Sequence, residues 1–179
     1  MLLTGLLPDI TTDPAIETAT DSVEAGRSGT IVAPVGIRPP LLAAVASRAA
    51  TPLVVLTATG RDAESLTNAL ASWIPGVAML PAWETLPHER LSPQVDTMAR
   101  RIAVLRRLVH PIKGDDSAGP ISVLVVPIRA FLQPIISGLA DLEPVRVRKG
   151  DILDLTETTN RLAELGYERV DMVEGRGQM

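Results

Sequence analysis

The residues that first suggest chemistry lie between Ala33 and Pro40, where the chain reads A-P-V-G-I-R-P-P. A phosphate-binding loop has the pattern G-x-x-x-x-G-K-[ST], in which glycine N–H groups surround the phosphates, lysine neutralises charge and a hydroxyl holds Mg²⁺. Placed on that pattern, the two glycines, the lysine and the hydroxyl are replaced by Ala33, Arg38, Pro39 and Pro40, and Gly36 lies inside the loop. Proline offers a phosphate neither an N–H group nor a cation. We therefore expect no cofactor here, while Arg38 either holds an anion or is an ordinary surface arginine.

A second group of chemistry-bearing residues, W-E-T-L-P-H-E-R-L-S, begins at Trp83 and contains Glu84, His88 and Glu89. The zinc motif H-E-x-x-H would require a second histidine where Ser92 stands. Because the chain has two histidines and no cysteine, we expect no metal site. Trp83 could stack on a nucleic-acid base, but no basic and aromatic residues alternate around it. We favour a half-buried packing role for this side chain.

Four apolar runs, rich in β-branched residues, alternate with segments of helical periodicity before residue 140. The runs occupy residues 30–33, 52–57, 77–80 and 121–126. Strands that are buried on both faces have such uninterrupted apolar runs, which are typical of a parallel sheet covered by helices. The predicted fold class is therefore α/β, a doubly wound and largely parallel sheet over residues 29–140. The Ala33–Pro40 loop would follow the first strand, where a phosphate site is expected in such folds.

Residues 1–28 form a predicted N-terminal arm with one short helix. Asp13 supplies an N-cap and Pro14 a first helical residue, and apolar residues then recur at helical spacing until Gly26. Nothing in this arm suggests chemistry.

The pattern changes at residue 141, where we place the start of a smaller α+β domain that is incomplete at residue 179. Residues 145–148 and 167–173 alternate apolar and charged side chains, as half-exposed strands do. Between them, Asp154 and Glu157 have the spacing of a capping box that opens a helix, which Gly166 ends.

Charged residues on the outward faces of these two predicted strands are the candidate partner-binding residues: Arg146, Arg148, Arg169 and Asp171. Val170 and Met172 are expected to face inward. Four further arginines belong to the predicted helix after Ser92: Arg100, Arg101, Arg106 and Arg107. We interpret them as a solvated helix face, with contact to other domains as the alternative.

Composition excludes several functional classes. Apolar residues make up 46% of the chain and charged residues 21%, which is typical of a folded globular protein. The net charge of -4 argues against DNA binding by this chain alone, because phosphate binding depends on positive charge. No apolar run approaches the roughly 20 residues that span a bilayer, and the apolar start lacks the basic leader of a signal peptide. With no cysteine in addition, we expect a cytoplasmic protein without a membrane partner.

A family resemblance rests mainly on residues 80–93, L-P-A-W-E-T-L-P-H-E-R-L-S-P. This segment resembles the W-E-T-L-P-x-[DE]-x-x-S-P element of the transcription-repair coupling factors, the Mfd family. Weaker matches follow in the family's order at residues 125–127, 149–150 and 165–171. The layout is also similar to the N-terminal part of UvrB, which has a true phosphate loop in the place of Ala33–Pro40. UvrB further carries a long aromatic-rich hairpin where this chain has only residues 81–92.

The resemblance implies a non-catalytic, UvrB-like module that helps to recruit UvrA, the partner of UvrB in nucleotide excision repair. It implies that ATP and Mg²⁺ serve the translocase motor of a longer parent protein, and that RNA polymerase and DNA bind other domains of that parent. In the family the chain continues into a V-R-G segment whose arginine contributes to UvrA contact, and that segment would lie beyond Met179. The docking surface would then be incomplete here.

Two other classes of function stay open from the residues alone. One is a nucleotide-binding α/β enzyme with an unorthodox phosphate loop. The other is a free-standing regulatory domain with a doubly wound fold, which the incomplete second domain argues against.

Overall fold

The computed structural model describes residues 2–84, 94–147, 149–175 and 177–179. Its centre is a three-stranded parallel sheet of β1 (Leu53–Thr57), β2 (Val77–Met79) and β3 (Val123–Pro127). The strand order is β1-β3-β2, so β3 lies in the middle, with Leu53 and Val77 both level with Val123. The predicted α/β class with a parallel sheet is confirmed.

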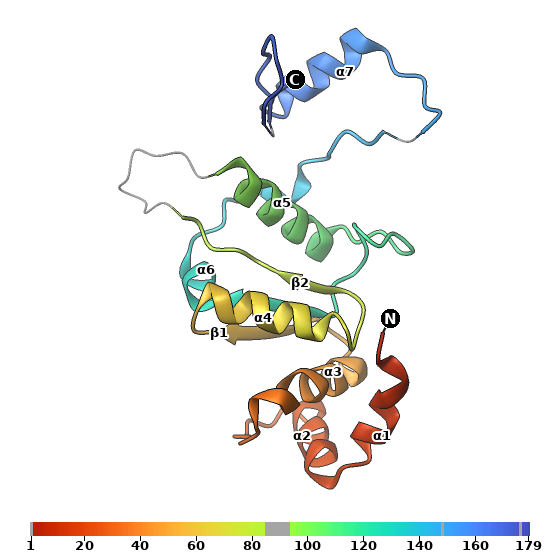
Figure 1. Cartoon of the computed structure of the whole chain (residues 1–179), viewed down its shortest axis with the longest axis vertical. Helices are drawn as coiled ribbons and strands as arrows, with labels where there is room; N and C mark the ends of the chain where they lie inside the picture. Colours follow the sequence, from red (N-terminus) through yellow and green to blue (C-terminus); the bar gives the residue numbers. More distant parts are fainter. Residues whose placement is uncertain (1, 85–93, 148, 176) are drawn as a thin grey trace.

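Helices cover both faces of this sheet, which explains the apolar run of β3 (Figure 1). On one face, α3 (Arg38–Arg48) and α4 (Gly60–Leu70) bury alanines and leucines against Val123 and Val125. On the other face, α5 (Val95–Val109) places Val104 in a cluster with Leu124 and Val126. Every residue of β3 is buried as a result.

The turn before β2 aligns it with β3. Gly76 has a φ of +75°, a conformation that side-chain-bearing residues rarely adopt. Its carbonyl accepts a hydrogen bond of 2.8 Å from the Ser122 N–H, and a Cβ atom at this position would lie 2.8 Å from the Pro120 carbonyl oxygen. Glycine is therefore required by both the backbone angle and the close approach.

The N-terminal arm consists of a 3-10 turn (Thr4–Leu6), α1 (Leu7–Thr11) and α2 (Pro14–Glu24). The predicted cap is confirmed, because the Asp13 carboxylate accepts a hydrogen bond of 2.9 Å from the Ala15 N–H. The arm is not a loose tail: α2 packs Ala19 against Leu41 and Val45 of α3.

The first predicted strand is wrong. Residues 30–33 form no strand, and the Val32 side chain is 95% exposed. They lead through a 3-10 turn (Val35–Ile37) directly into α3. A β-branched run becomes a strand only beside a neighbour that pairs with its backbone, and no described strand lies beside this one.

Three helical segments follow β3: α6 (Ile128–Leu132), a 3-10 turn (Leu139–Asp141) and α7 (Leu155–Glu164). The expected start and end of α7 are confirmed: the Asp154 carboxylate accepts from the Glu157 N–H at 2.8 Å, and Gly166 has a φ of +86°. Figure 1 shows α7 and the C-terminus at one end of the molecule, beyond α5.

The two strands predicted for this C-terminal part are not formed in the described residues. Residues 145–147 have no regular structure, and residues 167–173 contribute a single bridge, between Glu168 and Gln178. Met172 is exposed rather than inward, while Val170 is half-buried as expected. A strand with one buried face needs a partner layer, and the sheet formed by the described residues contains only β1, β3 and β2. The boundaries at 28 and 140 stay predictions.

Among the described residues, no helix is long and apolar enough to cross a bilayer.

Candidate functional site

The Ala33–Pro40 segment begins as extended chain and becomes the first turn of α3. Gly36 lies in the 3-10 turn and has no positive φ, and a Cβ atom added there would meet nothing within 4 Å. The loop therefore does not use the conformational freedom for which phosphate loops employ glycine.

Two prolines shape the start of α3 instead. Arg38 is the first residue of α3, and Pro39 and Pro40 follow it where a helix has N–H groups without intrahelical partners. Pro40 is buried, so it serves packing, whereas Arg38 is exposed. A helix start without N–H groups at two successive positions is a poor anion site, because those groups make up the site. The loop also follows no strand, contrary to the predicted placement.

A group of residues with several contacts to other elements lies after the carboxyl end of β2, at Pro81–Glu84. The Trp83 N–H donates to Gln133 Oε1 at 2.8 Å, and Gln133 Nε2 donates back to the Trp83 carbonyl at 3.3 Å. One side chain thereby satisfies both backbone groups of Trp83, as a neighbouring strand would. Trp83 is half-buried, as predicted.

Arg101 lies over the Trp83 ring, and its burial corrects the solvated-face interpretation of the α5 arginines. It is only 1% exposed, its Nη1 donates to the Pro81 carbonyl at 2.6 Å, and its guanidinium carbon lies 4.4 Å from the Trp83 ring centre. Burial lowers the pKa of Arg101, because the charged form loses water. The neighbouring Arg100 does face solvent and pairs with Asp96 at 2.7 Å.

Glu84 is fixed by α5 and α6. The Thr97 hydroxyl donates to the Glu84 carboxylate, and Arg129 Nη2 donates to the Glu84 carbonyl at 3.1 Å. The hydrogen bond from Thr97 holds the pKa of Glu84 below its ordinary value. Because Trp83 and Glu84 are both held by side chains from other elements, this segment is a rigid support and not an open base-stacking platform. His88, Glu89 and Ser92 lie outside the described residues.

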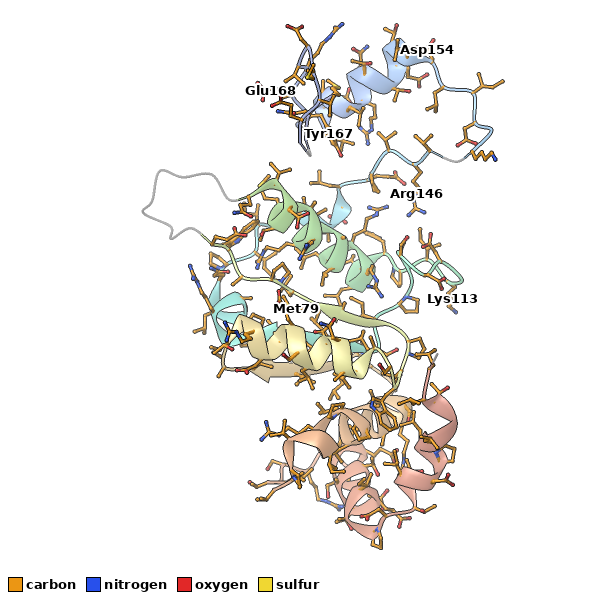
Figure 2. All side chains as sticks on the ribbon, in the orientation of Figure 1. Met79, Lys113, Arg146, Asp154, Tyr167 and Glu168 are labelled. Atoms are coloured by element: carbon orange, nitrogen blue, oxygen red, sulfur yellow. The ribbon has the colours of Figure 1, made fainter. Side chains whose placement is uncertain are left out.

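The candidate partner-binding residues are not gathered on one strand face. Arg146 ion-pairs with Asp115 at 3.6 Å and lies on the connection that leaves the α/β part, while Glu168 and Tyr167 lie in the C-terminal part beyond it (Figure 2). Arg169 and Asp171 are exposed. Arg148 lies outside the described residues.

Sequence reasoning missed the contacts that attach residues 139–143 to the end of α5. His110 Nε2 and Asp141 Oδ1 are 2.7 Å apart, and Arg106 Nη1 donates to the Leu142 carbonyl at 3.1 Å. Arg106 also approaches Glu143 at 3.6 Å. Pairs between residues 30 or more positions apart leave no local signal in a single sequence.

One cavity of about 350 Å³ lies between the end of α3 and the end of α5. Its lining is largely alanine and proline, with Arg107 as its charged member, and the Arg107 Nε group already donates to the Gly119 carbonyl at 2.9 Å. It lies beside residues 51–52 and 120–122, at the amino ends of β1 and β3, away from the Ala33–Pro40 loop. No group of three or more metal-ligating side chains occurs in the part of the chain that the structure describes.

Comparison with known proteins shows the family of the chain. No family model matches the chain. In an alignment of 152 residues that covers 83% of the chain, it is 46% identical to proteins named transcription-repair-coupling factor from Mycobacterium tuberculosis and Mycobacterium bovis. The chain belongs to the family of transcription-repair coupling factors.

A more distant member of the family, the transcription-repair-coupling factor of Escherichia coli, is 27% identical over 77% of the chain. In all three relatives, the matched region is 12% of the relative's length. The family assignment thus applies to a small part of proteins that are much longer.

Proposed function

We propose that this chain is a non-catalytic docking module of a transcription-repair coupling factor, and that it helps to recruit UvrA. The observation that carries the proposal is the 46% identity to coupling factors across most of the chain, W-E-T-L-P region included. UvrA as the partner comes from the resemblance of the sequence to the N-terminal part of UvrB.

The Ala33–Pro40 loop supports the non-catalytic part of the proposal. It presents prolines where a phosphate loop presents a lysine and a hydroxyl, and it neither follows a strand nor uses glycine conformations. The parent would be an ATP-dependent translocase whose motor, RNA polymerase contact and DNA contact all lie in other regions. This part of the proposal rests on the family.

Residues from 141 onward are the proposed UvrA-binding part. Arg146, Arg169 and Asp171 are exposed there, which suits rim charges that contact a protein partner. Such charges chiefly affect association rate and salt dependence, whereas hot spots carry the affinity. Because the family's V-R-G segment would follow Met179, the 179-residue chain should bind UvrA weakly.

The test compares two lengths of the protein by calorimetry against purified UvrA. The 179-residue chain should show weak or no binding, and a version extended through the V-R-G segment should bind clearly. In the extended version, Arg146→Glu with Arg148→Glu should weaken binding about tenfold or more, while Arg61→Glu on α4 is a charge-matched control. Circular dichroism of each variant checks folding.

Each outcome of this experiment decides something. Absence of binding by the extended version would remove UvrA recruitment from this region. Equal, tight binding by both lengths would show that the V-R-G segment is dispensable. Loss of binding with Arg61→Glu as large as with the paired change would mean that general charge, and not these arginines, governs the contact.

A further inference from the structure

The connection from the α/β part to the C-terminal part is attached to the end of α5 by charged side chains. Asp141 lies 2.7 Å from His110, and Glu143 lies 3.6 Å from Arg106. Because these pairs bring the connection to the end of α5, the residues that follow them pass beside the loop that leaves this helix. Arg146, one of the candidate UvrA-binding residues, lies on this stretch.

The loop after α5, which we call the Asp115 loop (residues 111–119), closes on itself and fixes one carboxylate. The Ile112 N–H donates to the Ala118 carbonyl at 2.8 Å. Asp115 Oδ1 accepts hydrogen bonds from the Ser117 hydroxyl at 2.7 Å and from the N–H groups of Ser117 and Ala118 at 2.8 and 2.9 Å. These bonds, the one from the Ser117 hydroxyl first, lower the pKa of Asp115. The carboxylate is therefore charged at neutral pH.

The second oxygen of this carboxylate faces Arg146. Asp115 Oδ2 lies 3.6 Å from Arg146 Nη1, whereas the bonds within the loop go to Oδ1. Figure 2 shows Arg146 on the connection, above the loop that carries Lys113. The Arg146 and Asp115 side chains are 39% and 30% exposed, so a protein partner can reach the pair. Arg146 thus already has an acidic partner within its own chain.

Arg146 cannot serve Asp115 and an acidic partner equally well. A guanidinium whose charge is already neutralised attracts a second carboxylate less, and two carboxylates at one guanidinium repel each other. We propose that Asp115 occupies the position that a carboxylate of UvrA takes on Arg146, so that UvrA displaces Asp115 when it binds. This inference rests on the proposed function, because it takes UvrA as the partner. A protein that brings no carboxylate to Arg146 gains nothing by displacing Asp115, so the pair also favours an acidic partner surface.

Asp115→Asn tests the proposal, because it separates the roles of the two oxygens. The amide oxygen keeps an acceptor for Ser117 and Ala118, while the amide nitrogen replaces Oδ2 and offers Arg146 no negative charge. In the version extended through the V-R-G segment, this variant should bind UvrA roughly two- to fivefold more tightly in calorimetry at low salt, as expected for release of an exposed ion pair. The gain should disappear in about 0.5 M NaCl, because salt screens the pair.

Two controls assign the gain to Arg146. Asp116→Asn removes the same charge from the next residue, which is exposed, and should leave the affinity unchanged. In an Arg146→Gln background, Asp115→Asn should have no effect on the affinity. An equal gain from Asp116→Asn, or a gain that persists with Arg146→Gln, would overturn the proposal, because overall charge would then set the affinity.

Failure of this inference differs from failure of the proposed function. If the extended parent binds UvrA and Asp115→Asn binds no more tightly, the competition is overturned and UvrA recruitment stands. If neither the extended parent nor any variant binds, recruitment and competition are overturned together. Circular dichroism checks the folding of each variant.

The pairing of Asp115 with Arg146 is measurable without UvrA. In the 179-residue chain, carbon-detected NMR titration should show an upward shift of the Asp115 midpoint in Arg146→Gln, since the arginine charge favours the carboxylate. Ser117→Ala should shift it further, because the Ser117 hydroxyl has the larger effect on this pKa. Lys113→Gln removes a positive charge from the same loop and is the control, with little or no shift expected. An Asp115 midpoint that Arg146→Gln leaves unchanged would show that the two side chains do not pair in solution, and would overturn the proposal.

Discussion

At the scale of single residues, the arrangement around Trp83 shows how a polar side chain can be a core residue. Arg101 is nearly as inaccessible as the valines of β3, yet it carries a guanidinium. Its side chain is buried between α5 and the segment after β2, where the guanidinium donates to a carbonyl oxygen and contacts an aromatic face. Removing it would leave a cavity and an unpaired carbonyl.

We expect Arg101→Ala to lower the free energy of unfolding by about 2–4 kcal/mol, since it combines a cavity with a lost buried hydrogen bond. Urea denaturation measures this effect. In a Trp73→Phe background, the remaining Trp83 emission should shift to longer wavelength in the variant. Arg100→Ala, one residue earlier and exposed, is the control and should cost about 0.5 kcal/mol or less. Equal losses for the two variants would contradict the buried role of Arg101.

The ionisation of Glu84 gives a second prediction at this scale. Because the Thr97 hydroxyl donates to the carboxylate, the folded-state pKa of Glu84 is depressed from its ordinary 4.5. A depressed carboxyl pKa adds stability above the unfolded-state pKa, and that stability is lost as pH falls through the folded-state value. Thr97→Val should therefore be less stable than the parent at pH 7, and the two should converge in acid.

Carbon-detected NMR titration of Glu84 measures the effect directly. Thr97→Val should move its midpoint upward, toward the ordinary value. Thr67→Val on α4, whose hydroxyl bonds only within its own helix to the Ala63 carbonyl, is the control. An unchanged Glu84 midpoint in Thr97→Val would show that another group sets the pKa.

At the scale of elements, sequence periodicity located β1, β2, β3 and the long helices because each is defined by local burial. It also found the caps of α2 and α7, whose signals lie within four residues. Residues 30–33 carry the same β-branched signal without becoming a strand, because strand formation also requires a neighbour. The predicted solvent exposure of Arg101 was wrong for a related reason. Helical periodicity places Arg101 at the margin of the apolar face of α5, and only the contact with Trp83 decides that the side chain is buried. Gln133 carried no local signal at all.

One arginine adds polar contacts to the apolar packing of α2 on α3. Arg48 Nε bonds to Glu24 at 2.6 Å, while Nη2 bonds to Asp21 and Nη1 to the Thr20 hydroxyl, both at 2.9 Å. These bonds to the two carboxylates raise the pKa of Arg48. Arg48→Ala should thus speed amide exchange across α2 severalfold while leaving β3 unchanged.

Hydrogen exchange with peptide-level readout measures this, and Arg27→Ala, just beyond α2, is the control. The difference should shrink in 1 M NaCl, because the contacts are exposed and salt screens them. If α2 exchanges at the parental rate in Arg48→Ala, apolar packing of Ala19 alone holds the helix.

At the scale of the whole molecule, the proposal of a non-catalytic module predicts no ATP turnover. Phosphoryl transfer requires metal-holding carboxylates and motor elements in addition to a phosphate loop. Replacing Ala33, Pro39 and Pro40 together by glycine, lysine and threonine should therefore create no hydrolysis. Phosphate release with Mg²⁺ should equal a no-protein control for both parent and variant, and magnesium-dependent turnover by either would contradict the proposal.

Helix α5 has a mechanical consequence for the molecule. Its 15 residues form a rod of about 22 Å. In its first half, Thr97 and Arg101 bond to the segment after β2, and at its end Arg106 and His110 bond to Leu142 and Asp141, which lead toward α7. Because an α-helix stretches far less readily than a loop, a displacement of the residues bonded at one end of α5 moves the residues bonded along its first half by nearly the same amount. A pull on the C-terminal part is consequently transmitted along the axis of α5, which has about four turns, to the segment that contains Trp83.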